Sequence, residues 1–314
     1  MSITVDTAFI NTYKSNVIML AQQKGSRLKQ YVRNERQSSE VDFYERIGAV
    51  EAQDVTNRHG DTPIMNTPHS RRAVSMTDCE YGDLIDKVDR LRMLIDPQGP
   101  YTMAAVNAIG RKTDDKIIAA MLGNAYSGKD GTTAVALPAS QKIAAFDGVT
   151  TTGVGLNVKT LIAVAKKFED NDVDDSLARY FAYTSYQKQD LLNQTEVTNA
   201  DYASVKALVD GNVDTFMGFK FIRTQRLVRS ATDITYTKTD GTVAAGTGTI
   251  TAAKSRRCFA WCEDGLVLAE GIDPFVRIAE RTDKRFSMQV YVAASNGAGR
   301  LEEEKVVEVD CSEG

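Results

Sequence analysis

The sequence predicts an α+β fold, in which helices and strands occupy different stretches of the chain. Three observations support this prediction: a long polar hairpin lies early in the sequence, one long helix follows it, and long alternating strands lie near the C-terminus. Both kinds of element occur between the helix and the last strands, but β-α-β units of regular length are few. A doubly wound parallel sheet is therefore not expected.

The first segment is expected to be helical from residue 8 to residue 33. Phe9, Tyr13 and Val17 recur every four residues, which places them on one face of a helix. Gly25 interrupts the pattern. We interpret this segment as an N-terminal arm.

The next segment, residues 41–89, is typical of a hairpin that cannot fold alone. Its expected strands are residues 43–55 and 71–79. The connection between them is polar, and Ile64 and Met65 are among its few strongly apolar residues. Because an isolated two-stranded hairpin is only marginally stable in water, we expect this one to lie against another molecule. A second copy of the chain is the simplest candidate.

The longest helix is expected between Pro100 and Leu122. Pro100 suits a first helical position, and Gly123 suits the residue after the last turn. At roughly 1.5 Å per residue, the helix is about 33 Å long. Gly110 is its weak point.

The middle of the chain combines helices and short strands. Asn157 can cap a second helix, in which apolar residues from Val158 to Phe168 recur at helical spacing. Residues 230–253 form an insertion rich in Thr, Gly and Ala, with Asp240-Gly241 as a hairpin turn signal. The other expected elements are strands at 179–184 and 218–223 and helical pieces at 187–193 and 202–209.

The C-terminal part is expected to consist of strands. Phe286, Met288, Val290 and Val292 alternate with polar or smaller residues, which indicates a half-buried strand. The other strands are expected at residues 258–262, 275–280 and 301–309.

Composition excludes several classes of protein. The chain has 314 residues, 42% hydrophobic and 25% charged, which is typical of a globular protein. Its net charge of −4 argues against a strong nucleic-acid binder. No run is long and apolar enough for a membrane span, and no signal peptide is expected. The four cysteines are sparse and uneven, so free thiols in a reducing compartment are expected rather than disulfides.

No catalytic, cofactor-binding or metal site is expected. Asp170, Asp172 and Asp174 match the first ligand positions of a calcium loop, but the required glycine and final glutamate are missing. Cys258 and Cys262 stand about 13 Å apart on a strand, too far for one metal ion. Both histidines of the chain, His59 and His69, lie in the polar hairpin connection, where a surface role is expected.

Two charged clusters leave alternatives open. Asp114, Asp115 and Lys116 on the long helix are the nearest approach to an enzyme site, although a solvated helix turn is the favoured explanation, because neighbouring residues on a helix do not face one another. The basic residues between 24 and 36 can contact nucleic acid nonspecifically, or form a solvated face or an arm docked on another subunit.

The order of elements resembles the major capsid proteins of tailed bacteriophages, which share the Hong Kong 97-type fold. The supporting sequences are DPQGPYTMAAVNAIGRKTDDKIIAAMLG (96–123), GFKFIRTQRL (218–227) and RIAERTDKRFSMQVYVAASNGAGRLEEEKVVEVDC (277–311). They are similar to the capsid branch of short-tailed and related phages. The resemblance implies the following division: residues 1–40 form an N-terminal arm, 41–90 an extended β-hairpin loop, 91–155 and 270–314 a peripheral domain with a long spine helix, and 156–269 an axial α/β domain.

The resemblance also implies a function and partners. The chain is expected to form pentamers and hexamers of an icosahedral capsid that encloses double-stranded DNA, and to be assembled in the host cytoplasm and located in the virion. Separate scaffolding, portal and cement proteins and nonspecific contact with packaged DNA are further expectations, without a cofactor or a membrane. The residues expected to contact neighbouring subunits are Phe9, Tyr13, His59, His69, Arg71 and Arg72.

Two other functions stay open at this point. An encapsulin-like cellular compartment shares the fold and the capacity for self-assembly. The second alternative is an unrecognised enzyme built on Asp114, Asp115 and Lys116. A Lys–Asn cross-link within the loop is not expected, because residues 56–70 contain Asn57 and Asn66 but no lysine.

Overall fold

The computed structural model describes residues 22–54, 64–86, 98–145, 154–194, 215–237 and 247–313. Contacts divide the chain into two compact units, which are described separately. Unit 1 comprises residues 1–26, 78–112 and 272–295; unit 2 comprises residues 27–77, 113–271 and 296–314. Four elements contribute residues to both units: β4 (Thr77–Ile85), α2 (Gln98–Leu122), β14 (Leu266–Arg281) and β15 (Ser287–Arg300).

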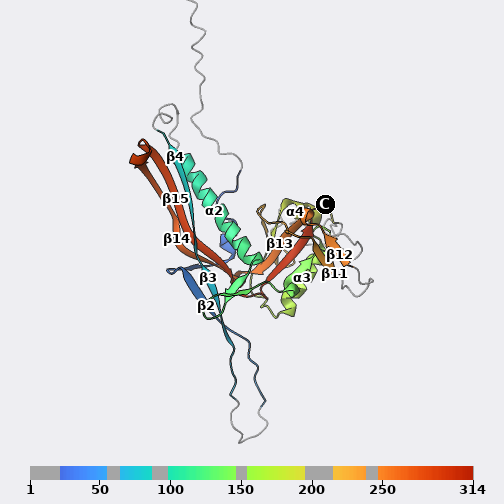
Figure 1. Cartoon of the computed structure of the whole chain (residues 1–314). Helices are drawn as coiled ribbons and strands as arrows, with labels where there is room; N and C mark the ends of the chain where they lie inside the picture. The colour runs from blue at the N-terminus through green and yellow to red at the C-terminus, as the bar shows by residue number, and fades with distance from the viewer. Residues whose placement is uncertain are drawn as a thin grey trace, which may run out of the picture. The chain divides into compact units, whose positions relative to one another are not determined.

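In unit 1, the first half of α2 packs against β4 and β15 (Figure 1). Ala105 and Ile109 of the helix form one apolar cluster with Val292 and Ala294 of β15. Cys79 and Tyr81 of β4 complete it. The strand predicted for residues 286–292 is confirmed from Ser287 onward, and Val290 and Val292 are fully buried as expected. The alternation is wrong at its start, because Phe286 precedes the strand and is 52% exposed, whereas Ser287 is buried.

The long helix α2 confirms the sequence prediction within two residues. It starts at Gln98, so Pro100 lies in the first turn, where the missing N–H has no helical partner to lose. It ends at Leu122, and the Gly123 N–H donates to the Ala119 carbonyl at 2.8 Å. Gly110 does not break the helix. A Cβ there would lie 2.6 Å from the Gly25 carbonyl carbon, so the glycine permits close approach of the N-terminal segment.

The prediction of a helix at residues 8–33 is wrong for residues 22–33, the part of this range that the structure describes. Residues 22–28 are irregular, and a 3-10 turn, η1 (Lys29–Tyr31), is followed by strand β1 (Arg33–Arg36). Gly25 has a φ of +63°, which ends helical geometry. Residues 8–21, with Phe9 and Tyr13, lie outside the described part of the chain.

The predicted hairpin is confirmed in unit 2, with shorter strands (Figure 1). Strands β2 (Val41–Ile47) and β3 (His69–Ser75) are antiparallel and belong to a four-stranded sheet of order β2-β3-β5-β6. Pairing stops at Gly48, whose N–H donates to the carbonyl of Pro68, because proline has no N–H to continue the ladder. The second predicted strand is two strands, since β3 ends at Ser75 and β4 belongs to another sheet. The other two strands of the sheet that contains β2 and β3 are shorter: β5 (Ala125–Ser127) and β6 (Thr133–Val135).

A six-stranded sheet carries the main core of unit 2. Its order is β7-β16-β13-β8-β10-β9, with antiparallel pairing around β13 and parallel pairing of β8 with β10 and of β7 with β16. Phe181, Phe259 and Trp261 are fully buried there. The strands are β7 (Lys142–Ala144), β8 (Arg179–Tyr183), β9 (Thr215–Phe216), β10 (Phe219–Arg223), β13 (Ser255–Cys262) and β16 (Val306–Ser312).

Both helices beside this sheet begin with side-chain caps. The Asn157 side chain accepts the N–H of Thr160 at 2.7 Å at the start of α3 (Val158–Asp170), as predicted. Leu161 and Phe168 then pack into the core. Helix α4 (Ser185–Leu192) begins with a capping box formed by Thr184 and Gln187.

The Thr- and Gly-rich insertion contains the expected hairpin. Strand β11 (Ile234–Thr237) pairs antiparallel with β12 (Thr247–Ile250). Its turn, with Asp240-Gly241, and the helix expected at 202–209 lie outside the described residues. The other short elements are 3-10 turns: η2 (Ala139–Gln141), η4 (Ala252–Lys254), η5 (Glu263–Gly265) and η6 (Thr282–Lys284).

The cysteines are free thiols, as expected. Burial raises the pKa of Cys262 to about 11, so this thiol stays protonated and unreactive near neutral pH. Within the described ranges, no group of His, Cys, Asp and Glu is arranged to hold a metal ion. None of the helices described is long and apolar enough to cross a membrane.

Strand β16 buries two carboxylates beside one another. Glu308 pairs with Arg257 of β13 and lies 3.4 Å from the Lys142 ammonium of β7. Asp310 is two residues further along the strand, on the same face. Its Oδ1 is buried without a hydrogen-bond partner. Burial, and secondarily the charge of Glu308, raise the pKa of Asp310 from 3.8 to about 7.

We predict that Asp310 makes the free energy of unfolding depend on pH. Because the folded-state pKa is the higher one, its contribution is fully present below pH 4 and is lost as the pH rises to about 7. In Asp310→Asn, the loss of stability between pH 5 and pH 7.5 should be smaller by about 1–3 kcal/mol, measured by denaturant unfolding. The exposed Asp170→Asn is the control. Equal pH slopes for Asp310→Asn and the unmodified chain would contradict the prediction.

Candidate functional site

The base of the hairpin in unit 2 holds three of the residues predicted to contact other subunits. His69, Arg71 and Arg72 lie on β3. Phe9, Tyr13 and His59 lie outside the described residues, so the structure does not bring them together with the others. Because side chains alternate along a strand, Arg71 and Arg72 point to opposite faces of the ribbon.

Arg71 lies on the outer face of the ribbon. Its Nη2 is 2.9 Å from the Glu45 carboxylate, and its guanidinium carbon is 5.5 Å from the Phe43 ring centroid. Both members of the ion pair are well exposed, with 39% and 59% of their side-chain surfaces accessible. An exposed pair of this kind contributes little to stability, so Arg71 can exchange its partner at low cost. Its contact with another subunit, like that of His69, stays a prediction.

Arg72 points inward, where its charge is matched within the chain. Its Nη2 lies 2.7 Å from each carboxylate oxygen of Glu303, and both side chains are more than nine-tenths buried. The Arg72 charge therefore has a partner within the chain, and its predicted contact with a neighbouring subunit stays a prediction. The sequence could not show this, since Glu303 is 231 residues away.

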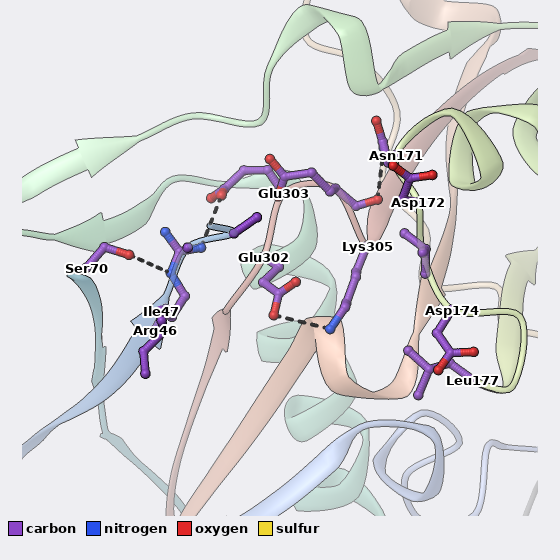
Figure 2. Close-up of a pocket in the computed structure, with 14 residues that line it drawn as sticks. Arg46, Ile47, Ser70, Asn171, Asp172, Asp174, Leu177, Glu302, Glu303 and Lys305 are labelled. Atoms are coloured by element: carbon purple, nitrogen blue, oxygen red, sulfur yellow. Dashed lines mark hydrogen bonds and ion pairs between the residues drawn. The ribbon is translucent and has the colours of Figure 1, made fainter. Parts of the chain in front are cut away.

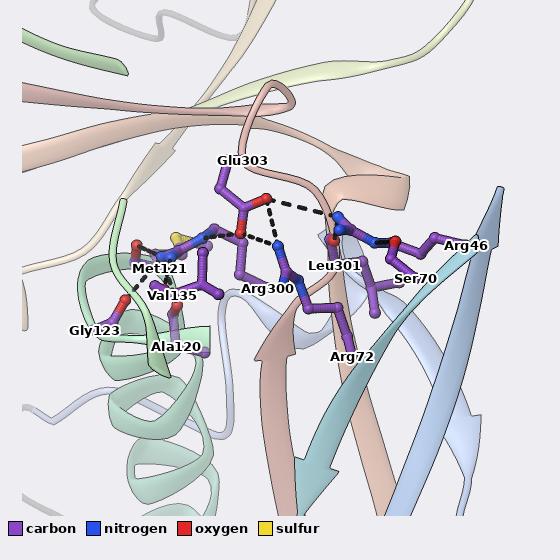
Figure 3. A network of polar contacts seen from close by, with 10 residues as sticks. All are labelled: Arg46, Ser70, Arg72, Ala120, Met121, Gly123, Val135, Arg300, Leu301 and Glu303. Carbon is purple, nitrogen blue, oxygen red and sulfur yellow. Dashed lines mark hydrogen bonds and ion pairs between the residues drawn. The ribbon is translucent and has the colours of Figure 1, made fainter. Parts of the chain in front are cut away.

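Two more arginines surround the same carboxylate (Figure 3). Arg46 of β2 lies 3.6 Å from Glu303 and donates to the Leu301 carbonyl at 2.5 Å and to the Ser70 hydroxyl at 3.3 Å. Arg300, at the end of β15, has its Nε 3.6 Å from Glu303. We call Arg46, Arg72, Arg300 and Glu303 the hairpin-base network.

Arg300 also closes the C-terminus of α2. Its guanidinium donates to the carbonyls of Met121 at 2.9 Å, Gly123 at 2.8 Å and Val135 at 3.0 Å. The carbonyls at the helix end carry a partial negative charge, which is about half an elementary charge. Burial lowers the pKa of the Arg300 guanidinium, and Glu303 opposes this effect. One carboxylate and the helix end thus compensate about half of the positive charge of the three guanidinium groups.

A cavity of about 590 Å³ opens beside this network (Figure 2). Its walls are residues 46–49 and Ser70 of the hairpin, the loop of Asn171–Asp174 with Leu177, and Glu302–Lys305 before β16. Glu302 is paired with Lys305 at 3.2 Å. The Glu304 carbonyl accepts from the Asn171 side chain at 3.2 Å. Among the charged side chains of the walls, five carboxylates outnumber two cations, and no nucleophile with a neighbouring base lies among the described residues that form them.

The alternative enzyme cluster on α2 consists of structural contacts. Asp114 is fully buried and accepts the backbone N–H groups of Arg27 and Leu28 at 3.0–3.1 Å. Asp115 makes a two-bond ion pair with Arg226. Lys116 donates to the Asn296 carbonyl at 2.8 Å. The three side chains point to different partners and do not form one site.

The basic N-terminal segment is partly neutralised within the chain. Lys29 pairs with Glu270, and Arg33 pairs with Glu35. Arg27 donates to the Arg223 carbonyl at 2.8 Å. Contact of this segment with nucleic acid stays a prediction. Fewer of its positive charges are free for such a contact than the sequence indicates.

We predict that Glu303→Gln destabilises unit 2, because three guanidinium groups then surround a neutral amide. Loss of one partner of a buried ion pair costs about 3–5 kcal/mol, and we expect a decrease of about 2–4 kcal/mol in the free energy of unfolding. The neighbouring Glu302→Gln removes only the partly exposed pair with Lys305 and should cost less than about 1 kcal/mol. Denaturant titration of both variants measures the difference. Similar values for the two would contradict the assigned role.

The comparisons with known proteins identify one family and one fold. Residues 5–313 match the family described as phage capsid protein. The search of curated proteins found no match. Three solved structures show the same fold across their length at low sequence identity. The first is the capsid of cyanophage P-SCSP1u, with a TM-score of 0.73 and 14% identity, covering 100% of this chain and 96% of that one.

The other two come from phages of different hosts. The capsid of Ralstonia phage GP4 has a TM-score of 0.71 and 10% identity, covering 99% of this chain and 98% of that one. The acid-stable capsid of Helicobacter pylori bacteriophage KHP30 has a TM-score of 0.68 and 12% identity, covering 100% and 99%. These likenesses confirm the predicted Hong Kong 97-type fold. The chain belongs to the phage capsid protein family, and it is a structural shell subunit of a bacteriophage capsid.

Proposed function

We propose that this subunit assembles into the pentamers and hexamers of an icosahedral shell that encloses double-stranded DNA, and that it has no catalytic activity. In this proposal, residues 1–40 are the arm and 41–90 the extended loop. Residues 91–155 and 270–314 form the peripheral domain, and 156–269 the axial domain. Assembly takes place in the host cytoplasm, with separate scaffolding, portal and cement proteins.

The observation that carries the proposal is the exposure of apolar side chains along the hairpin. Ile47 is 70% exposed, Val50 55% and Ile64 99%. Leaving such side chains in water gains nothing, whereas burying one stabilises a contact by about 1.5–3 kcal/mol. A neighbouring copy that covers the hairpin supplies this burial. The hairpin-base network supports the role, because it holds the start of the loop in a fixed direction.

Weak contacts suit a closed shell. Misplaced subunits can leave while each contact is weak, and many contacts per subunit stabilise the finished shell through multivalency. The encapsulin-like alternative requires the same contacts, but the family match favours the phage capsid. The enzyme alternative has no remaining support in the side chains on which it was based, since Asp114 and Asp115 are engaged in structural contacts.

We predict that deletion of residues 56–68 leaves a folded subunit that does not form shells. The hairpin-base network lies outside the deleted segment, so the thermal unfolding of the subunit should change little. Electron microscopy and sedimentation of the expressed chain measure assembly, and nuclease-protected DNA in the particles tests the genome-enclosing role. A variant with the same segment replaced by Gly and Ser controls for loop length. Shells of normal size and yield from both variants would refute the role of the hairpin.

A further inference from the structure

The base of the hairpin presents different chemistry on its two faces. In the antiparallel register, Arg46 lies opposite Ser70, whereas Glu45 lies opposite Arg71. Since directly opposite residues share a face and successive residues alternate, these two pairs lie on opposite faces of the ribbon. The face of Arg46 and Ser70 borders the 590 Å³ cavity. The face of Glu45 and Arg71 borders a smaller cavity of about 450 Å³.

The first face carries an excess of negative charge. Of its five carboxylates, Glu302 is matched by Lys305 and Glu303 by the arginines of the hairpin-base network. Asp172, Asp174 and Glu304 are exposed, and within the described ranges no Lys or Arg lies at ion-pair distance from them. Hydrogen bonds from Ser176 lower the pKa of Asp174, so this carboxylate remains charged. We call Asp172, Asp174 and Glu304 the acidic face.

The second face carries cations and apolar rings. Arg71, Lys129 and His69 line its cavity, and Glu45 is the only carboxylate among the described residues that do so. Phe43 and Tyr126 share this face, because Phe43 and Tyr126 both lie opposite Ala73 in the register. They are 39% and 48% exposed. We call Arg71 and Lys129 the cationic face, and His69 lines the same cavity.

The two faces are complementary and lie on opposite sides of one ribbon. A contact between unlike surfaces repeats from copy to copy, and it closes into a ring when the rotation between copies is suitable. Opposite charges at such a contact fix its register and accelerate association. The occupant is a second copy of the chain. Each copy carries one acidic face and one cationic face, so the two surfaces are present in equal numbers.

We propose that, in the assembled shell, the acidic face of one copy docks on the cationic face of the next copy. This inference rests on the proposed self-assembly and names the contact that fixes its direction. The rings of Phe43 and Tyr126 are covered in the contact, and Lys129 and Arg71 meet Glu304 and Asp172. Because the charges are exposed before docking, the contact weakens as the salt concentration rises.

Substitutions that reverse the charge of one residue on each face test the proposal. Lys129→Glu places like charges at the contact from one side, and Glu304→Lys does so from the other. Each single variant of the full chain, expressed under shell-forming conditions, should reduce the yield of particles about tenfold, because the like charges weaken every copy of the contact in the shell. The chain with both changes should recover most of the yield, because the two exchanged side chains again carry opposite charges across the contact. The control is Lys254→Glu, an exposed lysine outside both faces.

The measurements are particle yield by sedimentation and electron microscopy, with thermal unfolding of each subunit to establish that it is folded. Folded single variants with reduced yield, repaired by the combined change, support the contact. Single variants that assemble like the unmodified chain, or a combined variant that is not repaired, would overturn this inference while leaving the proposed function intact. Failure of the unmodified chain to form any shell would overturn the proposed function and the inference together.

Discussion

The structure of unit 2 depends on the neutralisation of buried charge at the base of the hairpin. Charged groups that are removed from water are tolerated only when they are paired and hydrogen-bonded. Glu303 supplies the one carboxylate that contacts Arg72, Arg46 and Arg300, and Arg300 reaches the carbonyl end of α2. The same few atoms therefore connect both hairpin strands, the end of β15 and the end of the long helix. This connection gives the exposed loop a fixed starting point.

A second junction, in which Asp114 is fully buried, lies on one turn of α2. Asp114 accepts the N–H groups of the segment before η1, Asp115 pairs with Arg226 after β10, and the neighbouring Lys116 donates to Asn296 in β15. Successive helix residues point about 100° apart, so one turn can reach three segments that are distant in the sequence. This cluster of charged residues has the composition of an active site, but its side chains connect α2 to three other segments, because each charge has its own partner.

Much of the fold could be predicted because its signals are local. Helix α3 is specified by the Asn157 cap and by helical spacing, and the alternation from Met288 to Val292 specifies a strand. Predictions failed where a distant group determined the backbone conformation. The Asp114 carboxylate accepts the N–H groups of Arg27 and Leu28 and competes with the helix expected there. Glu303 was missed for the same reason. It lies between two other glutamates, and only the fold determines that this one is buried.

The rigid base and the exposed loop have complementary consequences for assembly. A loop that was flexible at its root would lose conformational entropy at every contact, which reduces affinity by about 1–2 kcal/mol for each backbone residue that becomes ordered. A loop fixed at its root by buried ion pairs avoids that cost near the base, where Arg71 and Phe43 are already stacked. Its outer part, with Ile64 exposed, retains apolar surface for burial by a neighbour. In the proposed assembly, contacts near the base determine the direction of assembly, and contacts along the loop supply much of its stability.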